Sequence, residues 1–201
     1  LERAVFPIGA LEKPKVRELA QKAGLPTASK KDSTGICFIG ERNFSRFIGQ
    51  YIKKSVGPMV DIDSGKIMAH HEGLFHYTIG QRKGIGLGGR GNGEPWFVAG
   101  KDPATSTLYI CQGKNHPALF SMGLSADKMN WIAGQAPANR FDCTIKFRYR
   151  QNDVPCHVEV EGRRISVQFD TPQRAVTPGQ YAVLYQGEEC LGGGIIEQAV
   201  K

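Results

Sequence analysis

The sequence predicts a mostly β fold of the α+β class, with a short helical segment first, a β-rich middle and a small closed antiparallel β-barrel last. A single run near the start has the apolar repeat of an amphipathic helix. The 201 residues include 25 glycines and 11 prolines, which favour turns and short strands over long helices. The last third alternates apolar and polar residues with a period of two, which is typical of half-buried antiparallel strands.

The run "EKPKVRELAQKAGLP" predicts the helix. Pro14 suits a first helical turn, and Gly24 with Pro26 ends the pattern. A second, shorter helix is expected around residues 43–51, where aromatic side chains share one face. The apolar positions of the first helix recur at i, i+3, i+4 and i+7 and are Val16, Leu19, Ala20 and Ala23.

The middle of the chain has short apolar runs interrupted by glycine, aspartate and proline. Asp63, Ser64, Gly65 and Lys66 read as a hairpin turn. Strands are predicted near residues 59–62, 66–70, 96–102 and 107–112.

The regular alternation is clearest in "FDCTIKFRYR", residues 141–150. Further strands are expected near residues 156–160, 165–169, 182–185 and 189–192. Five or more short strands within about 80 residues predict a small closed barrel.

The net charge of +7 and the pI of about 9.2 favour a polyanionic partner such as nucleic acid, with ordinary solubility as the simpler interpretation. No apolar run is long enough to span a membrane. The five cysteines are odd in number, widely spaced and without a CxxC pair, which argues against a secreted disulfide framework and against a zinc finger. Cys111, Cys143, Cys156 and Cys190 are expected in strands or in the core, and no metal site is predicted.

The run "GIGLGG" from Gly84 to Gly89 matches the spacing G-x-G-x-x-G. A dinucleotide-binding turn requires a helix directly after it, and the following glycines and Pro95 exclude one. Two interpretations remain: a mobile loop, or a loop whose bare backbone approaches phosphate groups. The cations in and beside this loop are Arg82, Lys83 and Arg90.

Cys37 lies in "DSTGICFIGERNF", between glycines and close to cations in the sequence. Positive charge lowers the pKa of a thiol and favours the reactive thiolate. The neighbouring apolar residues instead favour a buried structural cysteine. Spacing alone leaves both interpretations open.

A family resemblance shifts this balance. The segments "LEKPKVRELA", "KKDSTGICFIGERNF", "GQRKGIGLGG", "EPWFV", "FRYRQNDVPC", "AVTPGQYAVLY" and "ECLGGGIIE" occur in this order. Together they resemble the tRNA-specific 2-thiouridylases over essentially the whole chain. The resemblance implies an enzyme that uses ATP with magnesium to adenylate the C2 oxygen of a wobble uridine, after which a cysteine persulfide delivers sulfur and AMP leaves.

Within the resemblance, Cys37 matches the cysteine that carries the persulfide. Arg148, Tyr149 and Gln180 match positions that contact tRNA. The ATP-binding loop of the family is absent from this sequence, so the chain is expected to be the C-terminal portion of a longer enzyme, to bind no cofactor itself and to be inactive alone. Periodicity places Arg148 on the polar face of its strand and Tyr149 on the inward face, so the strand must end or bend there for both to contact RNA.

The resemblance also implies the organisation and the partners. Residues 1–50 are expected to be the tail of the catalytic domain, residues 51–117 a central β-rich tRNA-binding domain, and residues 118–201 the barrel domain. The partners are expected to be tRNA and a persulfide donor, either a sulfur relay protein or a cysteine desulfurase, with no membrane. The expected location is the cytoplasm, with a mitochondrial or other organelle matrix as the alternative. An RNA-binding module with a structural Cys37 and a thiol redox enzyme are the competing functions.

Overall fold

The structure is a computed structural model that describes residues 3–31, 50–52, 55–148 and 151–201. The chain divides into two compact units, Leu1–Tyr51 and Ile52–Lys201, and each is described by itself. No helix in these described ranges is long and apolar enough to cross a membrane.

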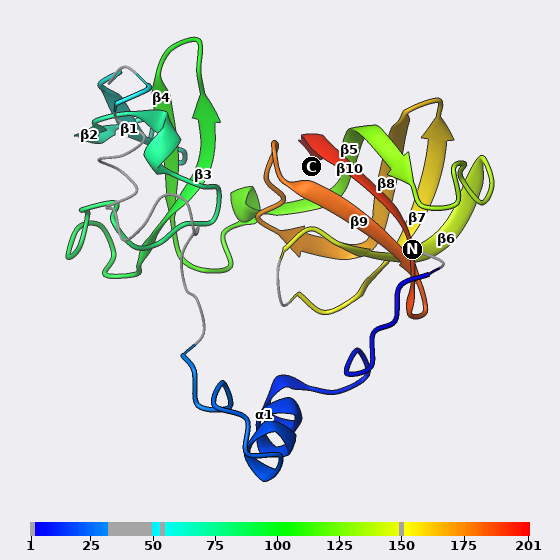
Figure 1. Cartoon of the computed structure of the whole chain (residues 1–201). Helices are drawn as coiled ribbons and strands as arrows, with labels where there is room; N and C mark the ends of the chain where they lie inside the picture. Colours follow the sequence, from blue (N-terminus) through cyan, green and yellow to red (C-terminus); the bar gives the residue numbers. More distant parts are fainter. Residues whose placement is uncertain (1–2, 32–49, 53–54, 149–150) are drawn as a thin grey trace. The chain divides into compact units, whose positions relative to one another are not determined.

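The first unit contains the predicted helix, α1 (Lys13–Lys22), with Pro14 in its first turn (Figure 1). Gly24 follows the helix with a φ of 66°, a left-handed conformation that glycine adopts without a steric penalty. Glu18 accepts hydrogen bonds from Lys15 at 2.9 Å and from Lys22 at 2.7 Å. These pairs, three and four residues apart, stabilise the helix from its exposed face. The second helix expected around residues 43–51 falls largely outside the described residues, and Gln50 and Tyr51 are in a turn.

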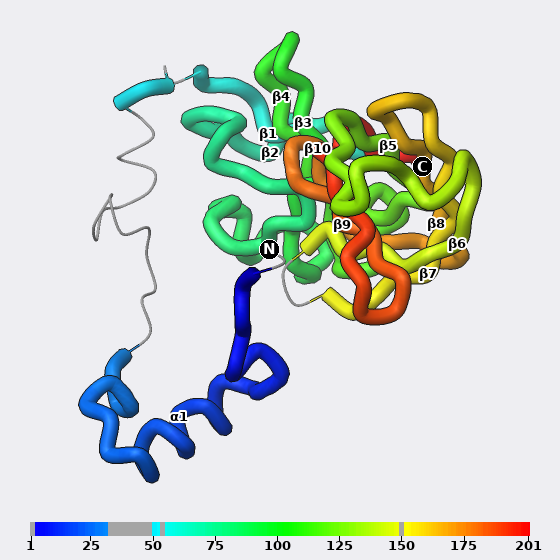
Figure 2. Tube along the Cα trace, turned by 45° about the vertical axis from the view of Figure 1, so that its right-hand side comes forward, coloured from blue at the N-terminus to red at the C-terminus, as the bar shows by residue number. Residues whose placement is uncertain are grey.

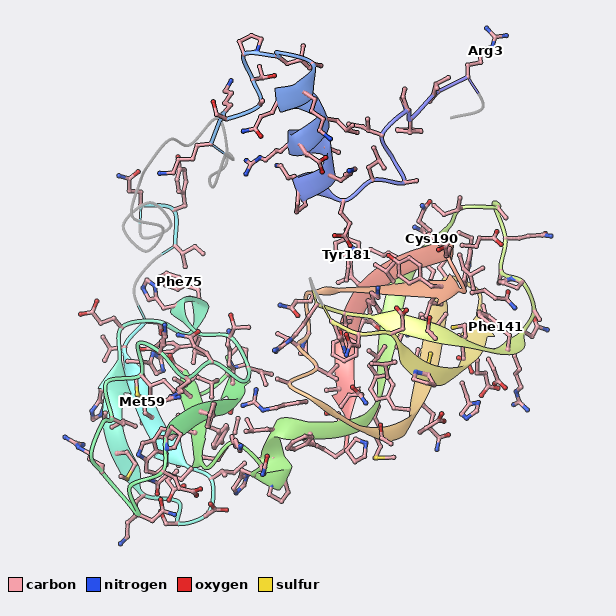
Figure 3. The ribbon with its side chains drawn as sticks, turned by 90° about the horizontal axis from the view of Figure 1, so that it is seen from below. Arg3, Met59, Phe75, Phe141, Tyr181 and Cys190 are labelled. Atoms are coloured by element: carbon pink, nitrogen blue, oxygen red, sulfur yellow. The ribbon has the colours of Figure 1, made fainter. Side chains whose placement is uncertain are left out.

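Ile52–Lys201 begins with a four-stranded sheet in the order β2-β1-β4-β3. Its strands are β1 (Gly57–Asp61), β2 (Ile67–His71), β3 (Trp96–Asp102) and β4 (Thr107–Gln112), so all four predicted strands are confirmed. The parallel pairing of β1 with β4 was not predicted. A short 3-10 helix, η1 (Leu74–His76), follows β2. The buried core of the sheet is formed by Met59, Ile85, Leu87, Trp96, Val98, Leu108 and Ile110, of which Met59 is labelled in Figure 3.

The predicted barrel is confirmed: six strands close in the order β10-β5-β8-β7-β6-β9, and each neighbouring pair is antiparallel (Figures 1 and 2). A second 3-10 helix, η2 (Pro117–Leu119), precedes it. The strands are β5 (Phe120–Trp131), β6 (Arg140–Lys146), β7 (Val154–Glu161), β8 (Arg164–Arg174), β9 (Tyr181–Gln186) and β10 (Glu189–Val200).

The sequence did not predict β5. Its pairing with β8 shifts register between Ser121 and Gly123, and Lys128 has a φ of 56°, so the alternation of a straight strand is broken. A Cβ at Gly123 would lie 2.4 Å from the Val167 carbonyl oxygen, so glycine is required where the strand passes its neighbour. β5 pairs on its other side with β10, and both pairings are needed to close the barrel.

The barrel interior follows the period of two that the sequence shows. β7 and β8 alternate buried and exposed residues along most of their length. The rings of Phe147 and Phe169 lie 5.8 Å apart between centroids, and both side chains are buried. These contacts identify Phe169 as a central packing residue of the barrel.

We expect Phe169→Ala to lower the free energy of unfolding by about 3–5 kcal/mol, because it removes a fully buried ring and leaves a cavity. Ile132→Ala is the control, since Ile132 is 68% exposed and its truncation should change the free energy by at most about 0.5 kcal/mol. Chemical denaturation followed by circular dichroism measures both. Similar losses for the two variants would contradict this packing.

Candidate functional site

Two of the residues singled out in the sequence, Cys37 and Tyr149, lie outside the described residues. The candidate site among the described residues consists of Arg148, Gln180 and the glycine-rich loop, Gly84–Gly89.

Arg148 lies just beyond the end of β6, which stops at Lys146, so its side chain has left the regular alternation of the strand. The local turn is held by Gln151, whose side-chain oxygen accepts a hydrogen bond from the Phe147 amide at 3.0 Å. The Gln151 amide donates in turn to the Arg148 carbonyl at 3.2 Å. β6 therefore ends before Arg148, and Tyr149 lies outside the described residues.

The guanidinium of Arg148 connects the barrel to the segment that follows η1. Its Nη2 donates to the Ala175 carbonyl oxygen at 2.8 Å and to the Ile79 carbonyl oxygen at 3.2 Å. Burial lowers the pKa of Arg148, and the charge of Arg174 lowers it further. The guanidinium stays protonated because arginine begins from so high a pKa. The guanidinium is therefore a half-buried positive charge whose Nε–H has no hydrogen-bond partner among the described residues.

Gln180 lies in the turn before β9, after Gly179, which has a φ of 86°. Its backbone is fixed on both sides: the amide donates to the Thr177 carbonyl at 3.3 Å, and the carbonyl accepts from the Ile196 amide at 2.8 Å. Its side-chain oxygen Oε1 is buried and has no hydrogen-bond partner among the described residues. The same is true of Nε of Arg148.

Both residues line one hollow of about 560 Å³ on the barrel. The volume lies within the range of small-molecule sites, roughly 300–1,000 Å³. Two residues that line the hollow thus each carry a buried polar atom without a described partner, Nε of Arg148 and Oε1 of Gln180. Its lining residues are Lys146, Phe147, Arg148, Gln151, Gln180, Tyr181, Val183 and Tyr185.

The aromatic and cationic side chains around the hollow are the residues that the sequence reasoning missed. The ammonium of Lys146 lies 5.5 Å from the ring centroid of Tyr185 and pairs with Asp153 at 3.0 Å. Tyr181, labelled in Figure 3, is 61% exposed. Such rings offer stacking faces to a base, and Lys146 adds positive charge. Their approach depends on the closure of the barrel between β6 and β9, and the order of strands in the sequence does not reveal this pairing.

The glycine-rich loop is anchored to the four-stranded sheet rather than detached from it. Ile85 and Leu87 are buried in the core of the sheet, while Arg82 and Lys83 are exposed. Arg90 is also exposed, although its Nη1 donates to the Met68 carbonyl at 2.6 Å. Gln112 holds the far side of the loop, because its Nε2 donates to the carbonyls of Arg90 at 2.9 Å and Glu94 at 3.0 Å.

The loop does not fit ATP. No helix follows it, so the dipole and amide groups of a nucleotide-binding helix are missing, as the sequence predicted. The hollow that it lines is about 280 Å³, at the lower limit for a small-molecule site. No group of side chains able to hold a metal ion occurs within the part of the chain that the structure describes.

The four cysteines after Cys37 are free thiols, and all lie in strands, as expected. Burial, followed by the charge of Asp63, raises the pKa of Cys111 to about 11, which makes this thiol unreactive. Cys190, labelled in Figure 3, is half-buried in β10. Cys143 of β6 and Cys156 of β7 face each other.

Three family models match successive parts of the chain. Residues 1–41 match a tRNA methyl transferase HUP domain, and residues 45–112 match a tRNA methyl transferase PRC-barrel domain. Residues 121–196 match an aminomethyltransferase beta-barrel domain, the region of the closed six-stranded barrel.

Curated relatives agree with these matches. The tRNA-specific 2-thiouridylase of Burkholderia ambifaria is 56% identical over 99% of this chain and 52% of its own length. Those of Tolumonas auensis and Yersinia pestis are 53% and 51% identical, each over 98% of this chain and 54% of the relative. The chain thus spans about half the length of the curated relatives it matches. On these similarities and the three successive domain matches, the chain belongs to the family of tRNA-specific 2-thiouridylases.

Proposed function

We propose that this chain is the persulfide-carrying and tRNA-binding portion of an enzyme that replaces the C2 oxygen of a tRNA uridine with sulfur. The observation that supports it most directly is the barrel hollow, which is lined by the cationic Arg148, by Gln180 and by the exposed Tyr181. A positive charge, an amide side chain and aromatic faces suit a nucleotide of a single-stranded or splayed RNA segment. The net charge of +7 favours the same partner.

In the proposed reaction, the uridine C2 oxygen attacks the α-phosphate of ATP, pyrophosphate leaves, and the adenylated oxygen becomes a leaving group. The terminal sulfur of a persulfide on Cys37 then attacks C2, and AMP departs with the oxygen. A second cysteine thiol, assigned to the part of the enzyme outside this sequence, attacks the Cys37 sulfur, so that the S–S bond breaks, 2-thiouridine is released and a disulfide with Cys37 remains. The base must leave its stack to be reached. Activation with ATP and magnesium is assigned to the part of the enzyme outside this sequence, because the ATP-binding loop of the family does not occur in these 201 residues.

The proposed division of labour follows the expected domains. Residues 1–50 carry Cys37 as the tail of the catalytic domain, and residues 51–117 and 118–201 bind tRNA. Arg148, Tyr149 and Gln180 are assigned to tRNA on the barrel, and Arg82, Lys83 and Arg90 are assigned to phosphate contacts from the glycine-rich loop. A persulfide donor protein, either a relay protein or a cysteine desulfurase, loads Cys37. Reduced thiols suit the cytoplasm, which is the proposed location.

Cys37→Ser in the full-length enzyme should abolish thiolation and leave tRNA affinity nearly unchanged, because a serine hydroxyl cannot carry a sulfane sulfur. Mass spectrometry of tRNA nucleosides measures 2-thiouridine, and filter binding measures affinity. Cys190→Ser is the matched control and should retain activity. Normal 2-thiouridine in the Cys37→Ser enzyme would favour an RNA-binding module with a structural Cys37.

Arg148→Ala should weaken binding about tenfold for all substrate tRNAs alike and reduce the salt slope by about one ion, because a phosphate contact carries no base information. The control is Arg163→Ala, which removes the same charge from the exposed turn between β7 and β8. Affinity is measured over a range of salt concentrations, and the melting temperature of each variant is recorded, since Arg148 also holds the barrel to Ile79. Equal effects for the two variants, or a loss confined to one tRNA, would argue against a phosphate contact.

This chain alone should bind tRNA weakly, with a steep salt dependence, and should not modify it. Binding is retained because the cations of the loop and the barrel lie within the chain, and modification fails because adenylation is missing. The chain is incubated with tRNA, ATP, magnesium and a persulfide donor, and 2-thiouridine and AMP are assayed. Either product above background would overturn the assignment of ATP activation to another part of the enzyme.

A further inference from the structure

The strongest feature that the proposed function leaves unused is a pair of thiols inside the barrel. Cys143 of β6 and Cys156 of β7 are direct partners in the antiparallel ladder. Their sulfur atoms lie 3.7 Å apart. Cys156 is 2% exposed and belongs to the barrel core, whereas Cys143 is half-buried at its margin.

The backbone positions of the pair allow a disulfide with some strain, because opposite side chains stand farther apart in a hydrogen-bonded pair than in a non-hydrogen-bonded pair. The Val160 amide donates to the Asn139 carbonyl at 2.8 Å, so these two opposite residues are a hydrogen-bonded pair. Such pairs recur every second residue along an antiparallel ladder, and Cys143 opposite Cys156 is therefore also a hydrogen-bonded pair. Pro155, which has no N–H, lies opposite Thr144 at a position that needs no hydrogen bond to β6. Cα atoms of a hydrogen-bonded pair are about 5.5 Å apart, within the range that disulfides span.

The two thiols differ in their surroundings. The one hydrogen of the Cys156 thiol has two acceptors within reach, the Cys143 carbonyl oxygen at 3.6 Å and the Cys143 sulfur at 3.7 Å. The hydrogen bond between the two sulfurs lowers the pKa of Cys143, whereas burial and the charge of Asp142 raise it. The contact and burial both raise the pKa of Cys156, which stays protonated. Cys143 is therefore the more nucleophilic and more accessible sulfur, with a second thiol directly beside it.

We propose that Cys143 and Cys156 form a reversible redox site that a small hydroperoxide converts to an intrachain disulfide. The Cys143 thiolate attacks the peroxide oxygen, the O–O bond breaks, and Cys143 becomes a sulfenic acid as hydroxide leaves and takes up a proton to form water. The Cys156 sulfur then attacks the Cys143 sulfur, the S–OH bond breaks, and a second water leaves with the Cys156 proton. Two thiols and one hydrogen peroxide thus give one disulfide and two waters.

Oxidation would restrain the segment that carries Arg148. The disulfide closes a ring over residues 143–156, which includes the whole connection between β6 and β7. The sulfur atoms must approach from 3.7 Å to about 2.0 Å, and a bond formed by such a shift is readily reduced. The site goes beyond the proposed function, and its formation does not depend on that function.

The test treats the chain carrying Cys37→Ser and Cys190→Ser with hydrogen peroxide, so that the pair and the buried Cys111 are its remaining thiols. Trypsin separates residues 141–146 from residues 151–163, each with one cysteine. We expect these two peptides to be linked, lighter by two hydrogen atoms, and released by dithiothreitol. The oxidised chain should melt about 5–10 °C higher, because a short ring is closed in the unfolded state.

Two variants test the order of the steps. With Cys156→Ala, peroxide should leave a sulfenic acid on Cys143 that dimedone traps, whereas with Cys143→Ala no adduct should form on Cys156. Any variant that fails to fold is replaced by kinetic alkylation of the chain that retains both thiols, where Cys143 should react first. Full alkylation of both thiols after peroxide treatment of the folded chain, or linkage of either cysteine to Cys111 or to a second chain, would overturn the proposal.

Discussion

The guanidinium of Arg148 holds the barrel against the segment that follows η1, and the proposed function uses residues of both. One nitrogen donates to carbonyl oxygens on both sides, Ala175 from the barrel and Ile79 from the segment after the first 3-10 helix. The backbones meet closely here: a Cβ at Gly80 would lie 2.5 Å from that of Ala175, and Gly80 has a φ of 80°. A side chain at position 80 would separate them, so glycine and arginine together fix the junction.

Arg148 also lines the barrel hollow, so the hollow lies beside this junction. Arg174 strengthens the junction, since its guanidinium lies 4.8 Å from the Phe97 ring centroid and its Nε donates to the Lys114 carbonyl at 3.3 Å. Arg148 and Gln180 both line the hollow, and Nε of Arg148 and Oε1 of Gln180 are buried without described partners. Arg148 therefore both stabilises the junction and lines the hollow to which the proposed RNA contact is assigned.

Much of the fold was predictable because its strands are short and patterned. The bounds of β3 and β4 match the prediction. The alternation of apolar and polar residues from Phe141 onward predicted the barrel. β5 was missed, since Gly123 and a register shift break its alternation where it must pass β8. Arg148 and Gln180 came from the family resemblance, whereas Lys146, Tyr181 and the Cys143–Cys156 pair became visible only through strand pairing and barrel closure.

The central claim is that tRNA occupies the barrel hollow and the glycine-rich loop of this chain. Hydrogen–deuterium exchange of the backbone amides, with and without substrate tRNA at low salt, tests it most directly. The account predicts slower exchange with tRNA in residues 146–151, 180–185 and 82–90, and unchanged exchange in β5 (Phe120–Trp131). Binding of tRNA without slower exchange in the first two segments would contradict the account.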